Sequence, residues 1–373
     1  MGVQKGVQSN ILKNFAVSID GTKLTNGQID GITIKWNVES FKVIGTMSFV
    51  DLTGLVEELP IRGGNTVTMA MTDFDGVVSK QSFKVMGVNT TRGKQHPGVT
   101  LTLVDPITVT AMQMYNEMSW HSATMLDIIN HPETLKPSLT GKKKDFCPPP
   151  PPHKNFVMPL HVSFNVVMHW LAKNADVMFY QSRDSFVIQP LKKLFKRGKK
   201  GDKFRLKTPN QQYRRNIYEY NLIMGKELQS SIFQPTGKVA SFDPSNKHSK
   251  HTNESFASAR GKLGETPAFG LTPDKQANTG AKYFYKSDYH VKETTSQQWM
   301  KHAYQDVQLE LLVPGQFGTN IGDIVEVEMD NWRLQSTPEK NMTGLWFISE
   351  IIDIIEAPEF VQRLTLSRSK YFK

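Results

Sequence analysis

The sequence predicts a mainly β fold with two similar antiparallel β-barrels, a small α/β domain and a long polar insertion. Short runs near both ends of the chain alternate apolar with polar residues, as in residues 308–313 and 324–329, and a period of two is that of a half-buried strand. Glycine and proline separate these runs. Between the two strand-rich ends, the pattern changes to helical stripes and polar loops.

The first barrel is predicted over residues 1–105. Its strands are expected in the alternating runs 15–21, 32–38, 41–51, 65–71, 83–88 and 98–104, and five or six strands can close a small barrel. An outward-facing Trp36 would suggest a surface on which bases stack. Trp36 shares its strand face with Ile32, Ile34 and Val38, however, and this favours a place in the core.

Residues 106–212 are predicted to form the inserted α/β domain. A short helix is expected over 122–130, with Ser122 as its N-cap, and a longer one over 163–172, where apolar residues form one stripe. A hairpin is expected over 177–181 and 186–189. Three lysines at 142–144 and five prolines at 148–152 predict a loop, because consecutive prolines cannot join a sheet.

A strongly basic run covers residues 192–207. It holds nine Lys or Arg and one acid, and therefore supplies +8 of the net charge of +10. Such a run can attract a polyanion. The candidate contacts are Lys192, Lys193, Lys196, Arg197, Lys199 and Lys200. A solvated loop explains the same run and is favoured, because no nucleic-acid module surrounds it.

The second barrel is predicted from residues 213–241 and 301–373, interrupted by the polar segment 242–300. That segment has too little apolar surface to fold alone. We expect a docking arm that becomes ordered on assembly, and a loop packed on its own subunit is the alternative. Large rings supply contact area at low entropic cost. The candidate docking anchors are Phe269, Tyr283, Phe284, Tyr285 and Trp299.

The two barrels share a pattern that suggests duplication. Residues 65–105 and the C-terminal segment from residue 307 both run through a glycine turn, a strand, a polar loop, a strand, a short break and a strand. Such repetition is the pattern of a duplicated antiparallel unit. We therefore expect two similar barrels in one chain.

In the order of its elements, the chain resembles the baseplate hub family of contractile-tail phages, and the hub portion of type VI secretion spike proteins is similar. The motif that carries the resemblance begins at Val313-Pro314-Gly315 and continues through Gly-Asp-Ile-Val-Glu-Val at 322–327, Trp-Phe-Ile-Ser-Glu-Ile-Ile-Asp at 346–353 and Leu-Thr-Leu-Ser-Arg at 364–368. The resemblance implies tube-type barrels in a homotrimer of pseudo-sixfold symmetry that joins a hexameric tail tube to a trimeric central spike.

The resemblance also implies partners and a place for the protein. The expected partners are the tail tube protein, the central spike protein and other baseplate proteins, with transient contact to DNA or a tape measure in the lumen. The expected location is the tail baseplate of the virion, assembled in the host cytoplasm. Two alternatives stay open: a nucleic-acid-binding protein that uses residues 192–207, and the hub of a secretion system or bacteriocin-like particle.

No enzyme, cofactor or metal site is expected. The sequence lacks a Gly-x-Ser-x-Gly elbow, a His-Glu-x-x-His pair and a Gly-Lys-Ser/Thr phosphate loop. Its ten histidines are scattered, and His248 and His251 have no carboxylate or cysteine partner at ligand spacing. The single cysteine, Cys147, is expected to be a passive thiol in a reducing compartment. No apolar run approaches the ~18 residues of a membrane span.

Overall fold

The computed structural model describes residues 10–52, 54, 61–92, 97–115, 118–135, 139, 142–146, 153–158, 161–175, 177–195, 197, 203–206, 215–224, 237–243, 248–254, 284–286, 307–330 and 342–368. Most described residues belong to strands, and one large sheet runs through both ends of the chain. The mainly β class, with two similar antiparallel units and a small α/β part, is confirmed.

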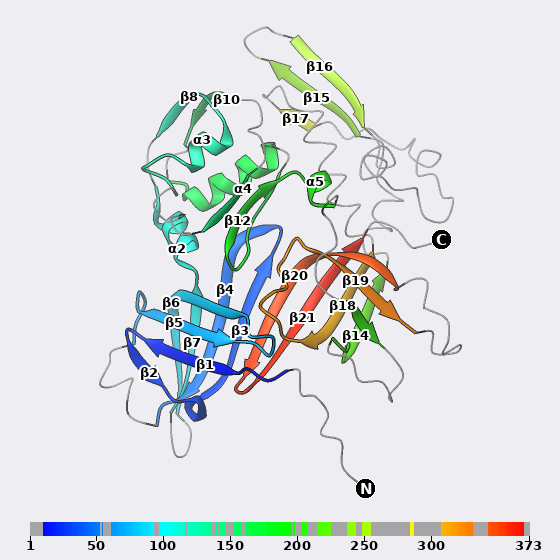
Figure 1. Cartoon of the computed structure of the whole chain (residues 1–373). Helices are drawn as coiled ribbons and strands as arrows, with labels where there is room; N and C mark the ends of the chain where they lie inside the picture. Colours follow the sequence, from blue (N-terminus) through cyan, green and yellow to red (C-terminus); the bar gives the residue numbers. More distant parts are fainter. Residues whose placement is uncertain are drawn as a thin grey trace.

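The first unit follows the alternating runs of the sequence, and its strands bury one face. The short helix η1 (Asn26–Gln28) lies between β2 and β3. The strands are β1 (Asn14–Ile19), β2 (Thr22–Leu24), β3 (Ile29–Asn37), β4 (Ser40–Val50), β5 (Thr66–Thr72), β6 (Val78–Arg92) and β7 (Pro97–Val104). They pair in the order β3-β4-β7-β6-β5-β1-β2. In Figure 1, β1 and β5 cross β3 and β4 steeply, so the sheet bends around its own core.

The α/β part lies on one side of the large sheet, above it in Figure 1. Its helices and strands are α2 (Pro106–Gln113), β8 (Ser119–Ala123), α3 (Met125–Ile129), β9 (Lys143–Phe146), β10 (His153–Val157), α4 (Phe164–Ala175), β11 (Met178–Gln181), β12 (Ser185–Gln189) and α5 (Leu191–Phe195). The expected helix stripe and hairpin are confirmed, because α4 buries Phe164, Val167, Met168 and Leu171, and β11 pairs with β12.

Two local predictions in this part are wrong. Ser122 does not cap a helix but lies in β8; Thr124 caps α3, because its hydroxyl accepts from the Asp127 amide while the Asp127 carboxylate accepts from the Thr124 amide. Lys143 and Lys144 are not in a loop but in β9, which pairs in parallel with β12. That pairing partner is 42 residues away at Lys143, so no local pattern could indicate it.

The second unit contains β13 (Phe204–Leu206), β14 (Glu219–Met224), β18 (Val307–Pro314), β19 (Ile324–Met329), β20 (Gly344–Glu356) and β21 (Glu359–Arg368). These strands pair in the order β14-β18-β21-β20-β19-β13. Strand β13 joins this unit although it lies within 106–212. The domain boundaries stay predictions. A separate sheet is formed by β15 (Gly237–Asp243), β16 (His248–Glu254) and β17 (Phe284–Lys286).

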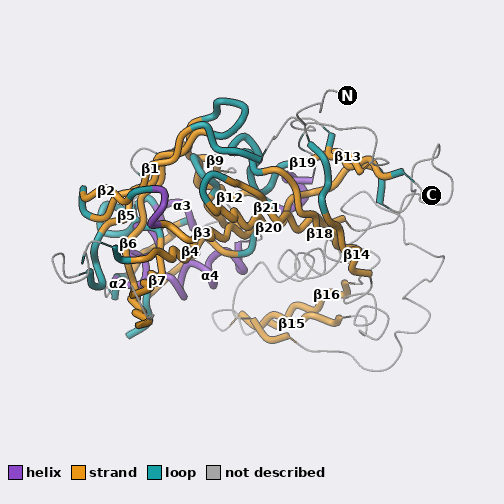
Figure 2. Tube along the Cα trace, turned by 90° about the horizontal axis from the view of Figure 1, so that it is seen from below, coloured by secondary structure: helices purple, strands orange, loops and turns teal. Residues whose placement is uncertain are grey.

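The two units are joined through β20 and β3. Residues 350–355 of β20 pair antiparallel with residues 32–37 of β3, and we call this contact the seam. Figure 2 shows β20, β21 and β18 continuing beside β3 and β4. One hydrophobic core extends across the seam from both units to the hairpin, where it includes Tyr180 and Val187, and a second core fills the α/β part.

The duplication extends to individual hydrogen bonds. Strands β14, β18, β19, β20 and β21 occupy in the second unit the places of β3, β4, β5, β6 and β7 in the first. Gly64 N donates to Val85 O at 2.8 Å, and Gly322 N donates to Ile348 O at 2.9 Å. The return bonds, from Val85 N to Asn65 O and from Ile348 N to Asp323 O, are both 2.9 Å.

The same strand is bulged at the same place in both units. In β6 the register against β7 shifts between Val85 and Gly87, and in β20 the register against β21 shifts between Ile348 and Glu350. A bulge adds one residue to one strand and increases its twist. Shared strand order, shared turn bonds and shared bulges together make the two units copies of one fold, which the glycine-turn pattern of the sequence indicated.

Candidate functional site

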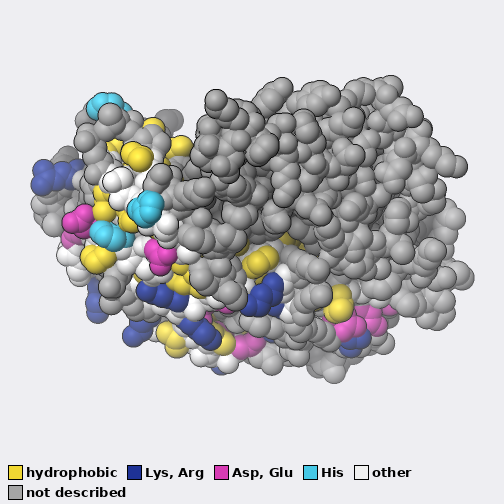
Figure 3. Space-filling model, turned by 90° about the horizontal axis from the view of Figure 1, so that it is seen from above, with side chains coloured by type: hydrophobic (Ala, Val, Ile, Leu, Met, Phe, Trp, Pro, Cys, Tyr) yellow, Lys and Arg dark blue, Asp and Glu magenta, His cyan; other side chains and the backbone are white. Residues whose placement is uncertain are grey.

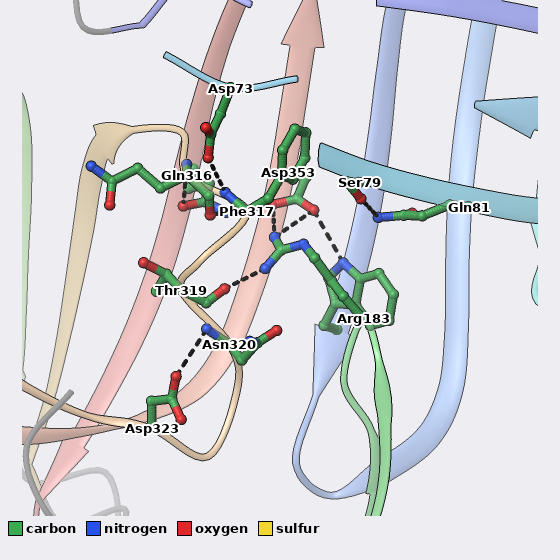
Figure 4. A network of polar contacts seen from close by, with 12 residues as sticks. Asp73, Ser79, Gln81, Arg183, Gln316, Phe317, Thr319, Asn320, Asp323 and Asp353 are labelled. Atoms are coloured by element: carbon green, nitrogen blue, oxygen red, sulfur yellow. Dashed lines mark hydrogen bonds and ion pairs between the residues drawn. The ribbon is translucent and has the colours of Figure 1, made fainter. Parts of the chain in front are cut away.

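The seam carries a buried polar network to which both units and the hairpin contribute (Figure 4). Arg183 lies in the turn between β11 and β12, Asp353 on β20 and Trp36 on β3. The turn of the hairpin brings the guanidinium down to the sheet at the point where the two units meet. One side chain of the α/β part therefore contacts the junction of the two duplicated units.

Three donor groups make four hydrogen bonds to the Asp353 carboxylate. Arg183 Nη2 donates to Oδ1 at 2.6 Å and to Oδ2 at 2.8 Å. Gln362 Nε2 donates to Oδ1 at 2.8 Å, and Trp36 Nε1 donates to Oδ2 at 3.2 Å. An ionised carboxylate has about four acceptor sites. All of them are used within the protein, so this carboxylate links the two units and the hairpin at the seam.

Burial makes the network important for stability. The side chain of Arg183 is 8% exposed and that of Asp353 is 1% exposed. Arg183 also donates to the carbonyl of Thr319, and its guanidinium lies 5.7 Å from the Trp36 ring and 5.6 Å from the Phe317 ring. Removing one partner of a buried ion pair leaves an uncompensated charge. The network therefore depends on all its members.

Two further contacts fix the parts around the seam. Asp73, 1% exposed, follows β5 and accepts the backbone N–H of Phe317 from the second unit at 2.8 Å. Gln181 at the end of β11 donates to the Phe41 carbonyl at 2.6 Å and to Asp105 Oδ1 at 2.9 Å. Asp105 is also the N-cap of α2. These bonds tie the α/β part to the first unit and the first unit to the second.

Two titratable groups near these contacts have shifted pKa values. Burial lowers the pKa of Lys142, whose Nζ donates to Gln181 Oε1 at 2.7 Å, while Asp105 and Asp184 oppose the shift. Burial raises the pKa of Tyr180, whose ring lies against Gly322. Both pKa shifts have the same cause, because burial removes water from the side chain and so disfavours its charged form.

The predicted polyanion contacts do not form one free cationic surface among the residues that the structure describes. Lys193 is exposed, whereas Arg197 is ion-paired with Asp145. Farther along the run, Lys203 contacts Glu326 at 2.6 Å and Arg205 contacts Glu328 at 3.2 Å. On the face seen in Figure 3, cationic and anionic side chains are interspersed. The side chains of Lys192, Lys196, Lys199 and Lys200 lie outside the described residues.

The predicted docking anchors are largely outside the described part. Phe284 and Tyr285 lie in β17, of which only the backbone is described. Phe269, Tyr283 and Trp299 lie outside the described residues. Their role stays a prediction.

Asp353, Arg183 and Asp73 were not predicted from the sequence as site residues. One signal was present for Asp353: it is the single charge in the apolar run Ile351-Ile352-Asp353-Ile354-Ile355. A charge inside a two-sided apolar strand must have a buried partner. The sequence does not say which cation that partner is, because Arg183 is 170 residues away.

The described part of the chain holds no group of three or more His, Cys, Asp or Glu that could bind a metal ion. None of its helices has the length and apolar character needed to cross a membrane.

No protein-family model matches the chain, and no curated protein matches its sequence. Its fold matches solved structures along almost its whole length. The 43 kDa tail protein of prophage MuSo2 from Shewanella oneidensis has a TM-score of 0.61 at 12% identity, with 95% of this chain and 98% of that chain covered. The tail protein from Neisseria meningitidis MC58 has a TM-score of 0.63 at 10% identity, with 96% and 97% covered.

A third similar structure comes from a secretion system. The E. coli c3393 protein, a component of the type VI secretion system, has a TM-score of 0.54 at 7% identity, with 95% of this chain and 77% of that chain covered. At these identities the likeness shows the fold. The chain therefore has the fold of phage tail proteins and of a type VI secretion component, as its resemblance to the hub family implied.

Proposed function

We propose that this chain is a structural, non-enzymatic baseplate hub subunit of a contractile phage tail. Three copies form a ring of pseudo-sixfold symmetry that joins the hexameric tail tube to the trimeric central spike, and further baseplate proteins bind around it. The hub assembles in the host cytoplasm and remains in the tail of the virion.

The duplication of the β unit carries this proposal. One chain presents two units with the same strand order, the same glycine-turn bonds and the same bulge. Three chains would therefore present six near-equivalent units on one ring, while the α/β part and the segment 242–300 occur only three times. Such a ring can contact a sixfold partner through one surface and a threefold partner through the other.

The fold comparisons support a tail role and leave two kinds of particle. Likeness to two phage tail proteins over nearly the full length of each chain favours a phage tail. Likeness to a type VI secretion component keeps the hub of a secretion system or bacteriocin-like particle as the second candidate. Nucleic-acid binding is less favoured, because Arg197, Lys203 and Arg205 contact carboxylates.

Light scattering on the purified protein tests the proposal. The expected mass is about three times the 42.2 kDa of one chain, approached as the protein concentration rises because assembly follows mass action. The measurement is repeated after nuclease treatment. A mass that stays at one or two chains over the whole range contradicts the hub, and a trimer that disappears with nuclease favours the nucleic-acid-binding class.

A further inference from the structure

The seam occupies only half of one edge of β20. Along that edge, residues 344–347 pair with β19 and residues 350–355 pair with β3. The strand therefore has two successive neighbours on the same side. The first neighbour belongs to its own unit and the second to the other unit.

Strand β6 is the counterpart of β20 and lacks the second neighbour. Its residues 78–84 pair with β5, as the first half of β20 pairs with β19. Residues 87–92 pair with β7 on one side only. Among the described residues no backbone partner lies on the other side, and Asn89, Thr90 and Thr91 are exposed.

Strand β14 is the counterpart of β3 and ends the large sheet. It pairs with β18 on one side, and the described part of the chain offers no strand on its other side. Its exposed residues include Tyr220 and Asn221. The opposite end of the sheet is β2, which has three residues and carries Lys23. Short strands and lysines protect an edge from pairing. Strand β14 has six residues, and neither β14 nor residues 87–92 of β6 contain a lysine.

We infer that residues 87–92 of β6 pair antiparallel with β14 of a second copy, in the register that β20 and β3 adopt within the chain. This inference rests on the proposed ring and assigns its interface. Transferring the register of the seam gives the opposed residues. They are Val88 with Met224, Asn89 with Ile223, Thr90 with Leu222, Thr91 with Asn221 and Arg92 with Tyr220, the second of each pair belonging to the next copy.

The side chains on the inner face fit this pairing. Val88 and Leu222 are only partly buried and lie at the margin of the core, whereas their counterparts Ile351 and Ile34 are both 0% exposed. Tyr220 is 46% exposed and its counterpart Ile32 is 1% exposed. Strand addition between copies would complete the burial that the seam already has within the chain. Main-chain bonds would supply affinity, and the alternating side chains would set the register.

The two edges are different surfaces, so the contact is head to tail. Such a contact produces a ring when its rotation closes. The rotation between neighbouring units of two copies must then equal the rotation between the two units of one chain. With equal rotations, β6 and β14 continue the large sheet around the whole ring. Each copy then uses both edges, and none remains open.

Paired cysteines test the register. In a Cys147→Ser background, Thr91→Cys and Asn221→Cys place thiols on directly opposed residues of neighbouring copies, while Thr33→Cys and Ile354→Cys place them on the counterpart pair inside the chain. Directly opposed residues lie within disulfide reach. Asn89→Cys with Asn221→Cys is the mismatched control, because a shift of two residues separates the thiols.

Oxidation should convert the Thr91/Asn221 variant to a covalent trimer on a non-reducing gel, with ~tenfold more interchain disulfide than the mismatched variant. The Thr33/Ile354 variant should close within single chains. Trimers by light scattering without the Thr91/Asn221 disulfide would overturn this interface and leave the hub proposal standing. Covalent dimers as the final product would also overturn it. Monomers at every concentration, with the Thr33/Ile354 disulfide formed, would overturn both.

Discussion

The seam and its counterpart edge have the same backbone but different side chains. At the seam, Asp353 faces Ile34 and binds Arg183, Trp36 and Gln362. At the counterpart edge, Thr90 stands in the place of Asp353 and Met224 in the place of Trp36. A buried charge needs permanent partners, which the chain supplies at the seam. A neutral threonine tolerates water before assembly and burial after it, as a contact between copies requires.

The comparison also shows what fixes the register within the chain. Side chains alternate between the faces of a strand, so a slip of one residue between β20 and β3 would move Asp353 away from Trp36 and Arg183. The network around Asp353 thus penalises a one-residue slip of the seam. Residues 87–92 of β6 include no carboxylate, and the register of this edge would be set by Val88 and Leu222 with their neighbours.

Removing the seam carboxylate should have the largest effect on stability. Asp353→Ala leaves the buried Arg183 without its partner, and we expect the free energy of unfolding to fall by about 3–5 kcal/mol. Chemical denaturation of the monomer measures it. Glu350→Ala on the same strand is the matched control, because its ion pair with Lys35 at 2.8 Å is partly exposed and should contribute about 0–1 kcal/mol. Equal losses for the two variants would contradict the special role of Asp353.

The paired turn glycines should respond unequally. Gly64 and Gly322 have φ values of 99° and 80°, so alanine at either position should cost about 1–2 kcal/mol through the backbone. A Cβ at Gly64 meets nothing within 4 Å, but one at Gly322 would overlap Tyr180 Oη. Gly322→Ala should therefore lose about 1–3 kcal/mol more in the same denaturation experiment.

A second substitution locates the cause of that difference. Tyr180→Phe removes the atom that a Cβ at Gly322 would meet first. The loss caused by Gly322→Ala should be smaller in the Tyr180→Phe background than in the parent. No difference between the two backgrounds would place the cost in the backbone alone.

The lowered pKa of Lys142, on the α/β side of the seam, predicts that the free energy of unfolding depends on pH. Its pKa in the folded chain lies below the ordinary 10.5, so between the two values the unfolded chain binds more protons. Stability then rises with pH in this window, by at most ~1.4 kcal/mol per pH unit for one group, and the contribution is flat below the folded pKa. Lys142→Met should remove the rise in denaturation curves taken from neutral to alkaline pH. An unchanged slope would contradict the shift.

The open edge should show the smallest effect in the isolated chain. Thr90→Ala changes an exposed side chain, so we expect the free energy of unfolding of the monomer to change by no more than about 0.5 kcal/mol. The same position in the other unit is Asp353, and the contrast between the two alanine variants measures how far the copies have diverged. A loss above about 2 kcal/mol would show that Thr90 already has buried partners within one chain.

The sequence by itself determined most strands of the two units, the pairing of the units as copies and the core position of Trp36. Runs such as 324–329 alternate apolar with polar residues, and Gly64 and Gly322 each precede a strand. These patterns depend only on neighbouring residues, so they can be recognised without knowing where the segment lies in the fold. Trp36 is 4% exposed, as its apolar neighbours on the strand predicted. The lone charge of Asp353 was also visible.

Only the tertiary structure decided which strands meet and which charges pair. The seam joins residues 32–37 to 350–355, Arg183 reaches Asp353 from the hairpin, and β9 enters a sheet with β12. Each of these contacts brings together segments from 42 to more than 300 residues apart. Side-chain periodicity fixes the face that a strand buries, but its neighbour is chosen by the packing of the whole core, which no single stretch of sequence contains.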